Sequence, residues 1–231
     1  MVNPKLVKTT FILGAVCSDG VVLVSDLLQR NPDNSEGLLR AKINFDNLKQ
    51  VAWGHAGVDY CVNNFNTRIE NTVNTRHVSY LDFPTLLANT YRELVSLDRR
   101  CEYDLEVLVA RVGSQAELFG IDGRYGFRPI TTFFPIGSGR DATIVALREK
   151  LKPELTMNQV ALIGYNAIKY LELKVKEAWV GTRKEHPQIA YLYNSPREGM
   201  AFMQTPTEAE LTEMRKTVAN ELGVSLESLD G

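Results

Sequence analysis

The sequence predicts an α+β fold, specifically a four-layer αββα sandwich of two antiparallel sheets flanked by helix pairs. Segments of strand character occur in blocks that alternate with pairs of helical segments, whereas βαβ units would alternate one strand with one helix. Several predicted strands are apolar on both faces, which is typical of strands covered on both sides. Because no linker or internal repeat divides the 231 residues, we expect one domain over residues 1–231.

The first block of strands is predicted to form two hairpins. Residues 10–17 and 21–26 are apolar and rich in β-branched side chains, and an Asp-Gly turn joins them. After a loop at 29–37 of Asn, Pro, Asp and Ser composition, residues 41–45 and 48–53 flank an Asp-Asn turn. We expect the strand at 10–17 to lie inside a sheet with both faces covered.

Helical and strand patterns then alternate to the end of the chain. Apolar residues at helical spacing predict the helices, and short β-branched or aromatic runs predict the strands. In chain order the expected elements are helices at 58–76 and 84–100, strands at 105–112, 116–121 and 127–136, helices at 141–151 and 156–179, strands at 188–193 and 199–203, and a helix at 206–222.

The composition excludes several classes of protein. With 44% apolar and 23% charged residues, the chain is typical of soluble globular proteins. A formal charge of −2 without long runs of like charge predicts no nucleic-acid or membrane partner. No apolar run approaches the roughly 18 residues of a membrane helix, and the run at 11–17 is too short for a secretory signal, so we expect a cytoplasmic protein.

Neither a metal site nor a cofactor is expected. The three cysteines, Cys17, Cys61 and Cys101, are odd in number and lie about 40 residues apart, which favours reduced thiols over a disulfide framework or a CxxC clip. None of the three histidines has a metal-ligating partner at i+3 or i+4. The sequence also lacks a Gly-x-x-x-x-Gly-Lys-Ser/Thr loop, so ATP binding by that route is not expected.

Four polar residues have ordinary structural explanations when each is taken alone. Thr10 suits the start of a strand, Asp26 suits the turn after one, and Lys42 suits a solvated strand edge. Ser138, in a Gly-Ser-Gly turn, suits the cap of the following helix. Their combination and spacing are more specific than any one of them.

The spacing of these residues resembles that of the proteasome family of N-terminal nucleophile (Ntn) hydrolases. Asp26 lies sixteen residues after Thr10, and Lys42 lies sixteen after Asp26, as in β-type proteasome subunits. The Gly-Ser-Gly turn puts Ser138 at the position of the family's serine. The resemblance covers residues 10–181 and implies the Ntn-hydrolase fold, a polypeptide substrate, and assembly into a homo- or hetero-oligomeric ring of related subunits.

The resemblance also implies a catalytic role for each residue. Thr10 becomes the nucleophile once residues 1–9, a short N-terminal extension or propeptide, are removed. Its freed α-amine, with an ordinary pKa of about 7.7 to 8.0, then acts as the base. Lys42 lowers the pKa values of that amine and of the hydroxyl, Asp26 keeps Lys42 charged and oriented, and Ser138 supports the site.

Other positions match the family less closely. A backbone N–H of Gly54 or Gly57 is expected to receive the oxyanion, because the sequence aligns there only after a small shift. Glu177 takes the place of the family's aspartate, whereas Val180 stands where the family has a serine. Thr9 stands where active precursors carry glycine.

These departures leave three functions open. The first is a proteasome-like N-terminal threonine peptidase. The second is a non-catalytic structural subunit of a proteasome-like ring, which would retain the fold without maturation. The third is an Ntn amidohydrolase that acts on a non-peptide amide, since fold does not determine substrate.

Overall fold

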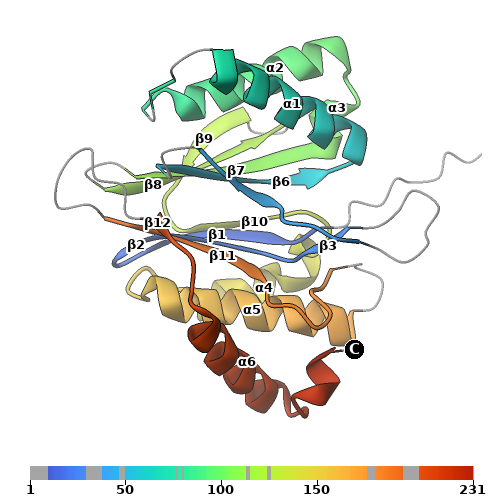
Figure 1. Ribbon diagram of the computed structural model, residues 1–231, viewed down its shortest axis with the longest axis vertical. Helices are drawn as coiled ribbons and strands as arrows, with labels where there is room; N and C mark the ends of the chain where they lie inside the picture. The colour runs from blue at the N-terminus through green and yellow to red at the C-terminus, as the bar shows by residue number, and fades with distance from the viewer. Residues whose placement is uncertain are drawn as a thin grey trace, which may run out of the picture.

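The computed structural model describes residues 10–29, 38–46, 50–75, 78–79, 81–112, 115–123, 126–175, 180–194 and 203–230. The expected extension at 1–9 and the candidate residue Glu177 lie outside these residues. Within them the fold is α+β with two five-stranded antiparallel sheets, as the sequence predicts (Figure 1). None of the helices in this part of the chain is long and apolar enough to cross a membrane.

The first sheet contains the strand that follows Thr10. Its strands, in the order β10-β1-β2-β11-β12, span Phe133–Ile136 (β10), Ile12–Cys17 (β1), Gly20–Ser25 (β2), Gln188–Tyr193 (β11) and Met203–Gln204 (β12). β1 and β2 form the first predicted hairpin, with Cys17 opposite Gly20. Because β1 also pairs with β10, it is an interior strand, as expected.

The second sheet contains the other predicted hairpin. Its strands, in the order β5-β6-β7-β8-β9, span Ile43–Phe45 (β5), Val51–Gly57 (β6), Leu105–Val112 (β7), Ala116–Asp122 (β8) and Gly126–Ile130 (β9). In the hairpin of β5 and β6, Ile43 lies opposite Gly54. A separate short pairing joins β3 (Leu28–Gln29) and β4 (Leu38–Leu39), on either side of the expected loop.

Helices lie outside both sheets. Figure 1 shows α1 and α2 on one side of the stacked sheets and α4, α5 and α6 on the other. α1 contacts β6, α5 contacts β1 and β2, and α6 packs on α5. The helices span Asp59–Thr75 (α1), Phe83–Leu97 (α2), Cys101–Asp104 (α3), Arg140–Lys150 (α4), Met157–Lys174 (α5) and Glu208–Leu222 (α6), and a 3₁₀ turn spans Glu227–Asp230 (η1).

Three apolar clusters fill the spaces between these layers, and β1 contributes to two of them. Leu13 and Ala15 pack in the cluster under α4, α5 and α6, whereas Ile12 packs in the cluster between the sheets. Since successive side chains of a strand point to opposite faces, a strand covered on both faces must be apolar at almost every position. Gly14 contributes by its small size, because a Cβ there would lie 3.0 Å from the side chain of Leu118 in the second sheet.

The single strand predicted at 127–136 is wrong. Its first half is β9, which pairs with β8 in the second sheet, and its second half is β10, which pairs with β1 in the first. Thr131 and Thr132 form the bend between them. The pattern did not reveal this crossing because both halves have strand character and no Gly or Asn marks the bend.

Other elements differ from expectation at their ends. α5 ends at Lys174, whereas helical spacing predicted a helix to 179, and residues 176–179 lie outside the described part of the chain. The strand expected at 199–203 is represented only by β12, because residues 195–202 are not described either. α3 and η1 were not predicted, since four residues are too few for a periodic pattern.

The prediction that all three cysteines are reduced is wrong. Cys61 at the start of α1 and Cys101 at the start of α3 form a disulfide, with their Cα atoms 5.6 Å apart. Sequence separation does not report spatial distance, and the fold brings the start of α1 close to the start of α3. Cys17 is free and buried, and burial together with the nearby Asp19 carboxylate raises the pKa of its thiol to about 12.

Candidate active site

The β1–β2 hairpin brings Thr10 and Asp26 to the same end of the first sheet. Ile12 lies opposite Ser25, so Phe11 and Asp26 face each other one step beyond the ladder. Two hydrogen bonds join them: the Asp26 N–H donates to the Phe11 carbonyl at 3.1 Å, and the Phe11 N–H donates to the Asp26 side chain, at Oδ1, at 2.9 Å. The interval of sixteen residues from Thr10 to Asp26 therefore follows from the register of one hairpin.

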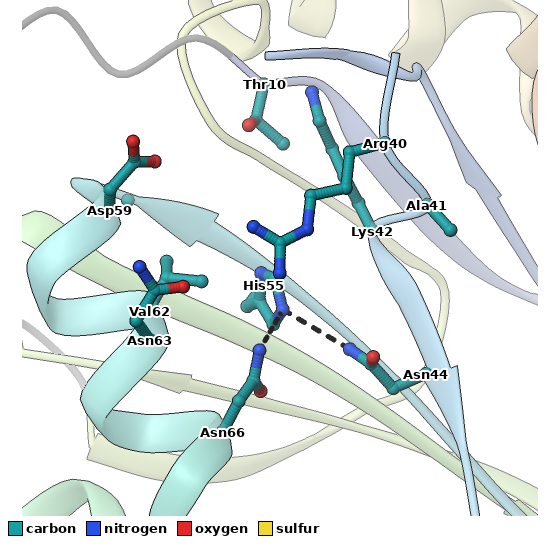
Figure 2. A pocket seen from close by; sticks show the side chains of 11 residues that line it. Thr10, Arg40, Ala41, Lys42, Asn44, His55, Asp59, Val62, Asn63 and Asn66 are labelled. Carbon is teal, nitrogen blue, oxygen red and sulfur yellow. Dashed lines mark hydrogen bonds between the residues drawn. The ribbon is translucent and has the colours of Figure 1, made fainter. Parts of the chain in front are cut away.

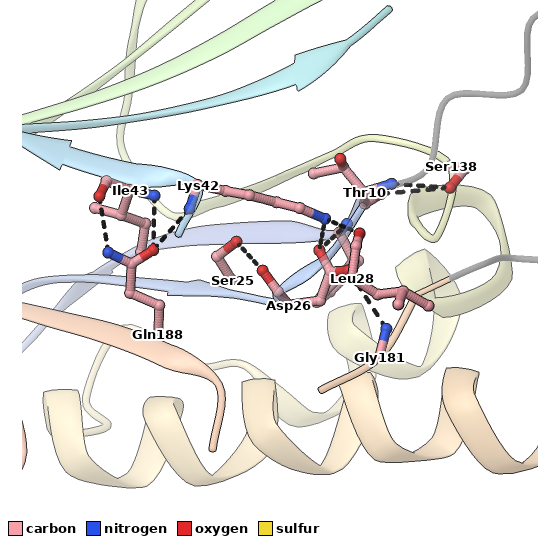
Figure 3. Close-up of polar contacts among 10 residues, drawn as sticks. Thr10, Ser25, Asp26, Leu28, Lys42, Ile43, Ser138, Gly181 and Gln188 are labelled. Carbon is pink, nitrogen blue, oxygen red and sulfur yellow. Dashed lines mark hydrogen bonds and ion pairs between the residues drawn. The ribbon is translucent and has the colours of Figure 1, made fainter. Parts of the chain in front are cut away.

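Lys42 comes from the segment before β5 and reaches the same place. Its Nζ lies 2.8 Å from Asp26 Oδ1 and donates to the Leu28 carbonyl at 2.6 Å. Figure 3 shows its side chain extended along the sheet toward Asp26 and Thr10. Exposure is 6% for Thr10, 5% for Lys42 and 0% for Asp26, so this ion pair is shielded from water.

The Asp26 carboxylate also accepts main-chain hydrogen bonds. Gly181 N–H donates to its Oδ2 at 3.3 Å, in addition to the Phe11 contact, and the Gly181 carbonyl accepts from the N–H groups of Leu27 and Leu28 at 3.0 and 2.9 Å. Burial raises the pKa of Asp26, while Lys42 and the two main-chain donors act in the opposite direction. The carboxylate is thus held by three elements that are distant in sequence.

The same burial shifts the pKa of Lys42 in the direction opposite to that of Asp26. Burial lowers the pKa of Lys42, while Asp26 and, more weakly, Asp59 favour its charged form. Lowering the pKa of a lysine makes it a better proton acceptor and donor near neutral pH than an exposed lysine is.

The Gly137–Gly139 turn encloses the main chain of Thr10. The Thr10 nitrogen donates to Ser138 Oγ at 3.3 Å, and this hydroxyl donates to the Thr10 carbonyl at 3.4 Å. Gly137 has a φ of 90°, and a Cβ there would lie 2.1 Å from the Thr10 carbonyl oxygen, so only glycine fits. Glu106, on β7, accepts from the Gly137 N–H at 3.0 Å and pairs with Arg140 at 2.7 Å, which fixes the turn.

A pocket opens beside Thr10, between the segment before β5, the end of β6 and the first turns of α1 (Figure 2). Its lining is mostly polar. The residues that line it are Thr10, Arg40, Ala41, Lys42, Asn44, His55, Gly57, Asp59, Val62, Asn63 and Asn66.

His55 is a neutral hydrogen-bond acceptor in this pocket. Burial is the main cause that lowers its pKa to about 4, and the Lys42 charge acts in the same direction. Its Nε2 lies 2.8 Å from Asn66 Nδ2 and 3.2 Å from Asn44 Nδ2, and both amides can donate to it (Figure 2). The pocket therefore combines uncharged amide and imidazole groups with the charged side chains of Arg40, Lys42 and Asp59, and the Arg40 side chain extends toward His55 (Figure 2).

The two glycines expected to offer an oxyanion donor have different surroundings. Gly54 lies inside β6, paired with Ile43 and Leu108 and packed on Ile12, away from the pocket lining. Gly57 is the last residue of β6 and lines the pocket with Thr10. The geometry therefore favours Gly57. The pairing of β5 with β6 ends at Gly54, so at Gly57 the β5 side of β6 is not covered by β5.

Several residues that shape the site were not found by sequence reasoning. Gly181 makes the contact to Asp26 through its main chain, whereas the neighbouring Val180, which stands where the family has a serine, is buried in the apolar cluster under the helices. Glu106 and Gln188 hold the Ser138 turn and the Lys42 main chain, respectively. Their sequence surroundings are ordinary strand residues, so no local pattern marks them.

Comparisons with known proteins identify the fold. No family model matches the sequence, and no curated protein matches it. Among solved structures, Anbu from Yersinia bercovieri, described as an ancestral beta-subunit, is 16% identical, with a TM-score of 0.67 over 92% of this chain and 95% of that chain. An Anbu mutant from Hyphomicrobium sp. strain MC1 is 13% identical, with a TM-score of 0.66 over 93% and 95% of the two chains.

The Anbu complex from Pseudomonas aeruginosa, described as a helical assembly, is similar to the same degree. It is 16% identical, with a TM-score of 0.67 over 92% of this chain and 94% of that chain. At such identities the likeness shows a shared fold and no more.

The assignment to the proteasome family as a β-type subunit is therefore wrong. No family model supports it, and the similar structures are Anbu proteins at 13 to 16% identity. The physical reason is that the interval between Thr10 and Asp26 reflects the register of the β1–β2 hairpin. Distant proteins that share the fold can share this interval.

Proposed function

We propose that this protein is a hydrolase that cleaves peptide bonds with Thr10 as an N-terminal nucleophile. The observation that carries the proposal is the buried pair of Lys42 and Asp26 beside Thr10, at the mouth of a polar pocket. Burying two charged groups is costly because both lose their hydration, so stability alone does not explain this ion pair. A functional constraint explains why such a pair lies beside Thr10.

The proposed reaction begins after residues 1–9 are removed. The freed α-amine of Thr10 takes the proton of its own hydroxyl, and the oxygen attacks the substrate carbonyl carbon. The resulting oxyanion accepts a main-chain hydrogen bond, for which Gly57 is the candidate donor. The protonated amine then gives its proton to the leaving nitrogen, and a water molecule hydrolyses the ester, so that the enzyme is regenerated.

The roles of the surrounding residues follow from charge and hydrogen bonding. The Lys42 ammonium stabilises developing negative charge on the Thr10 oxygen and lowers the pKa of the α-amine by like-charge repulsion. Asp26 holds that ammonium, and Ser138 Oγ, now 3.3 Å from the Thr10 nitrogen, would orient the freed amine. The polar pocket would receive a side chain of the polypeptide substrate next to the cleaved bond.

Two structural proposals accompany this function. We propose that the stacked sheets and outer helices form the four-layer αββα sandwich of Ntn hydrolases. We also propose that the chain assembles with related subunits in an oligomer. The helical assembly described for the Pseudomonas aeruginosa Anbu complex supports this, although it concerns that protein. Sedimentation as a monomer of 25.9 kDa at all concentrations would contradict assembly.

The decisive experiment uses a chain that begins at Thr10, released by a specific protease from a cleavable tag. We expect it to hydrolyse peptides from a mixed library, Thr10→Ser to retain activity, and Thr10→Ala to lose it with the fold unchanged by circular dichroism. Intact mass of the full chain shows whether residues 1–9 are removed without assistance.

The alternatives predict other results. Turnover of simple amides but no peptides would favour the amidohydrolase, whereas no turnover and no acyl adduct on Thr10 by mass spectrometry would favour a structural subunit. Full activity of Thr10→Ala would refute the assignment of the nucleophile.

A further inference from the structure

Gln188 connects the two sheets beside the candidate site. It is the first residue of β11, opposite Ser25 at the end of β2. Its side chain leaves the first sheet and contacts the main chain at the start of β5. Oε1 accepts from the N–H groups of Lys42 and Ile43 at 2.9 and 2.8 Å, and Nε2 donates to the Ile43 carbonyl at 2.7 Å (Figure 3).

These contacts provide the main chain at the start of β5 with hydrogen bonds of the kind that a neighbouring strand would make. Among the described residues, β5 is the outermost strand of the second sheet, and no described strand pairs with the outer side of its main chain. A glutamine amide offers both an acceptor with two lone pairs and a donor, as a strand main chain does. One side chain therefore satisfies three main-chain groups and fixes the point at which Lys42 leaves the sheet.

Lys42 is thus fixed at both ends. Its main-chain nitrogen is held by Gln188, and its ammonium is held by Asp26 and by the Leu28 carbonyl. A lysine side chain is flexible, and fixing only the ammonium would leave many conformations of its four-carbon stem. With the main chain fixed as well, few conformations of the Lys42 side chain remain, and the ammonium is kept beside Thr10.

We propose that Gln188 is a positioning residue, which holds the main chain of Lys42 so that its ammonium remains beside Asp26 and Thr10. The consequence for catalysis rests on the proposed function. The coupling between Gln188 and Lys42 does not, because it can be measured in a protein without activity.

The charged and titratable groups around Lys42 determine what the loss of Gln188 does. Lys42 faces Asp26 after β2, Asp59 at the start of α1, His55 on β6 and Arg40 in its own segment. Burial lowers its pKa from 10.5, against the effect of the two carboxylates. When the hydrogen bonds of Gln188 to the main chain are removed, water reaches the Lys42 ammonium, so its pKa rises toward 10.5.

The test is Gln188→Met, which keeps the length of the side chain and removes all three hydrogen bonds. Gln204→Met, on the exposed edge strand β12, is the matched control. Lysine side chains labelled with ¹³C at Cε are titrated by NMR, and the Lys42 signal is assigned by its absence in Lys42→Met. We expect the Lys42 pKa to rise in Gln188→Met only, and kcat to fall on the order of 10²-fold with KM nearly unchanged.

The outcomes separate the two proposals. An unchanged Lys42 pKa in Gln188→Met overturns the positioning role, even if stability falls. A shifted Lys42 pKa in a protein that never shows activity supports the positioning role while the proposed function fails. If Gln188→Met does not fold, Gln188→Asn replaces it, because its amide is one methylene shorter and withdraws from the main chain of Lys42 and Ile43. Wild-type values of the Lys42 pKa and of kcat in Gln188→Asn would also overturn the inference.

Discussion

Replacing Lys42 with methionine is expected to leave Asp26 buried without its cationic partner. Lys42 Nζ lies 2.8 Å from Asp26 Oδ1, and Asp26 is fully buried. Removing one partner of a buried ion pair costs about 3 to 5 kcal/mol. Asp26 keeps main-chain hydrogen bonds from Phe11 and Gly181, so we expect the free energy of unfolding at pH 7 to fall by about 3 kcal/mol, the lower end of this range.

The size of this loss depends on pH. Burial raises the pKa of Asp26, and the Lys42 ammonium opposes that rise, so in Lys42→Met the folded-state pKa lies further above the unfolded value of 3.8. The stability contributed by protonated Asp26 is complete below pH 3.8 and is lost as pH rises through the folded-state pKa. The difference between variant and wild type is therefore largest near neutral pH and shrinks toward about pH 4.

Urea unfolding of the variant and the wild type at pH 7 and at about pH 4 measures this difference in stability. Lys216→Met is the control, because its ammonium pairs at 3.3 Å with Glu213 on the exposed side of α6, and we expect it to cost about 1 kcal/mol or less. Lys42→Met combined with Asp26→Asn should recover part of the loss at pH 7, since no uncompensated charge remains. The reasoning is refuted if Lys42→Met costs no more than Lys216→Met, or if its cost does not change with pH.

Three further predictions concern the surroundings of the site. Gly137→Ala should unfold at lower urea concentration than Gly223→Ala: both have positive φ, 90° and 65°, but only at Gly137 would a Cβ meet a carbonyl oxygen, at 2.1 Å. Replacing Cys61 and Cys101 together by serine should lower the free energy of unfolding by about 4 kcal/mol, measured in urea, because the disulfide closes a loop of 40 residues; unchanged stability would contradict this. His55 should be neutral at pH 7, because burial lowers its pKa to about 4, and an imidazole NMR titration centred near 6.5 would be inconsistent with its environment.

The sequence predicts those parts of the fold that local pattern determines. The β1–β2 hairpin follows from two apolar runs around an Asp-Gly turn, and its register puts Asp26 opposite Phe11. The capping boxes that begin at Thr156 and Thr207 likewise mark the starts of α5 and α6. Where neighbouring residues supply the information, the expectation and the structure agree closely.

Contacts between distant segments could not be predicted in this way. The crossing at Thr131 between the two sheets depends on which strand edge each half meets, and the Cys61–Cys101 disulfide depends on how the fold brings together the starts of α1 and α3. Gly181 contacts Asp26 through its main-chain N–H, which every residue except proline possesses. Gln188 acts through a side chain that is ordinary at the start of a strand. Only the assembled fold gives these residues their roles.

The pairing of the first sheet also determines when that sheet can form during synthesis. β1 and β2 leave the ribosome before the partners on their outer edges, β10 and β11, which come from the later half of the sequence. Until those segments emerge, the nascent hairpin exposes two unpaired edges and two apolar faces, and closing such distant pairings is slow. Translation between β2 and β11 is therefore the period in which this chain is most vulnerable to aggregation, and the one in which a chaperone would have most effect.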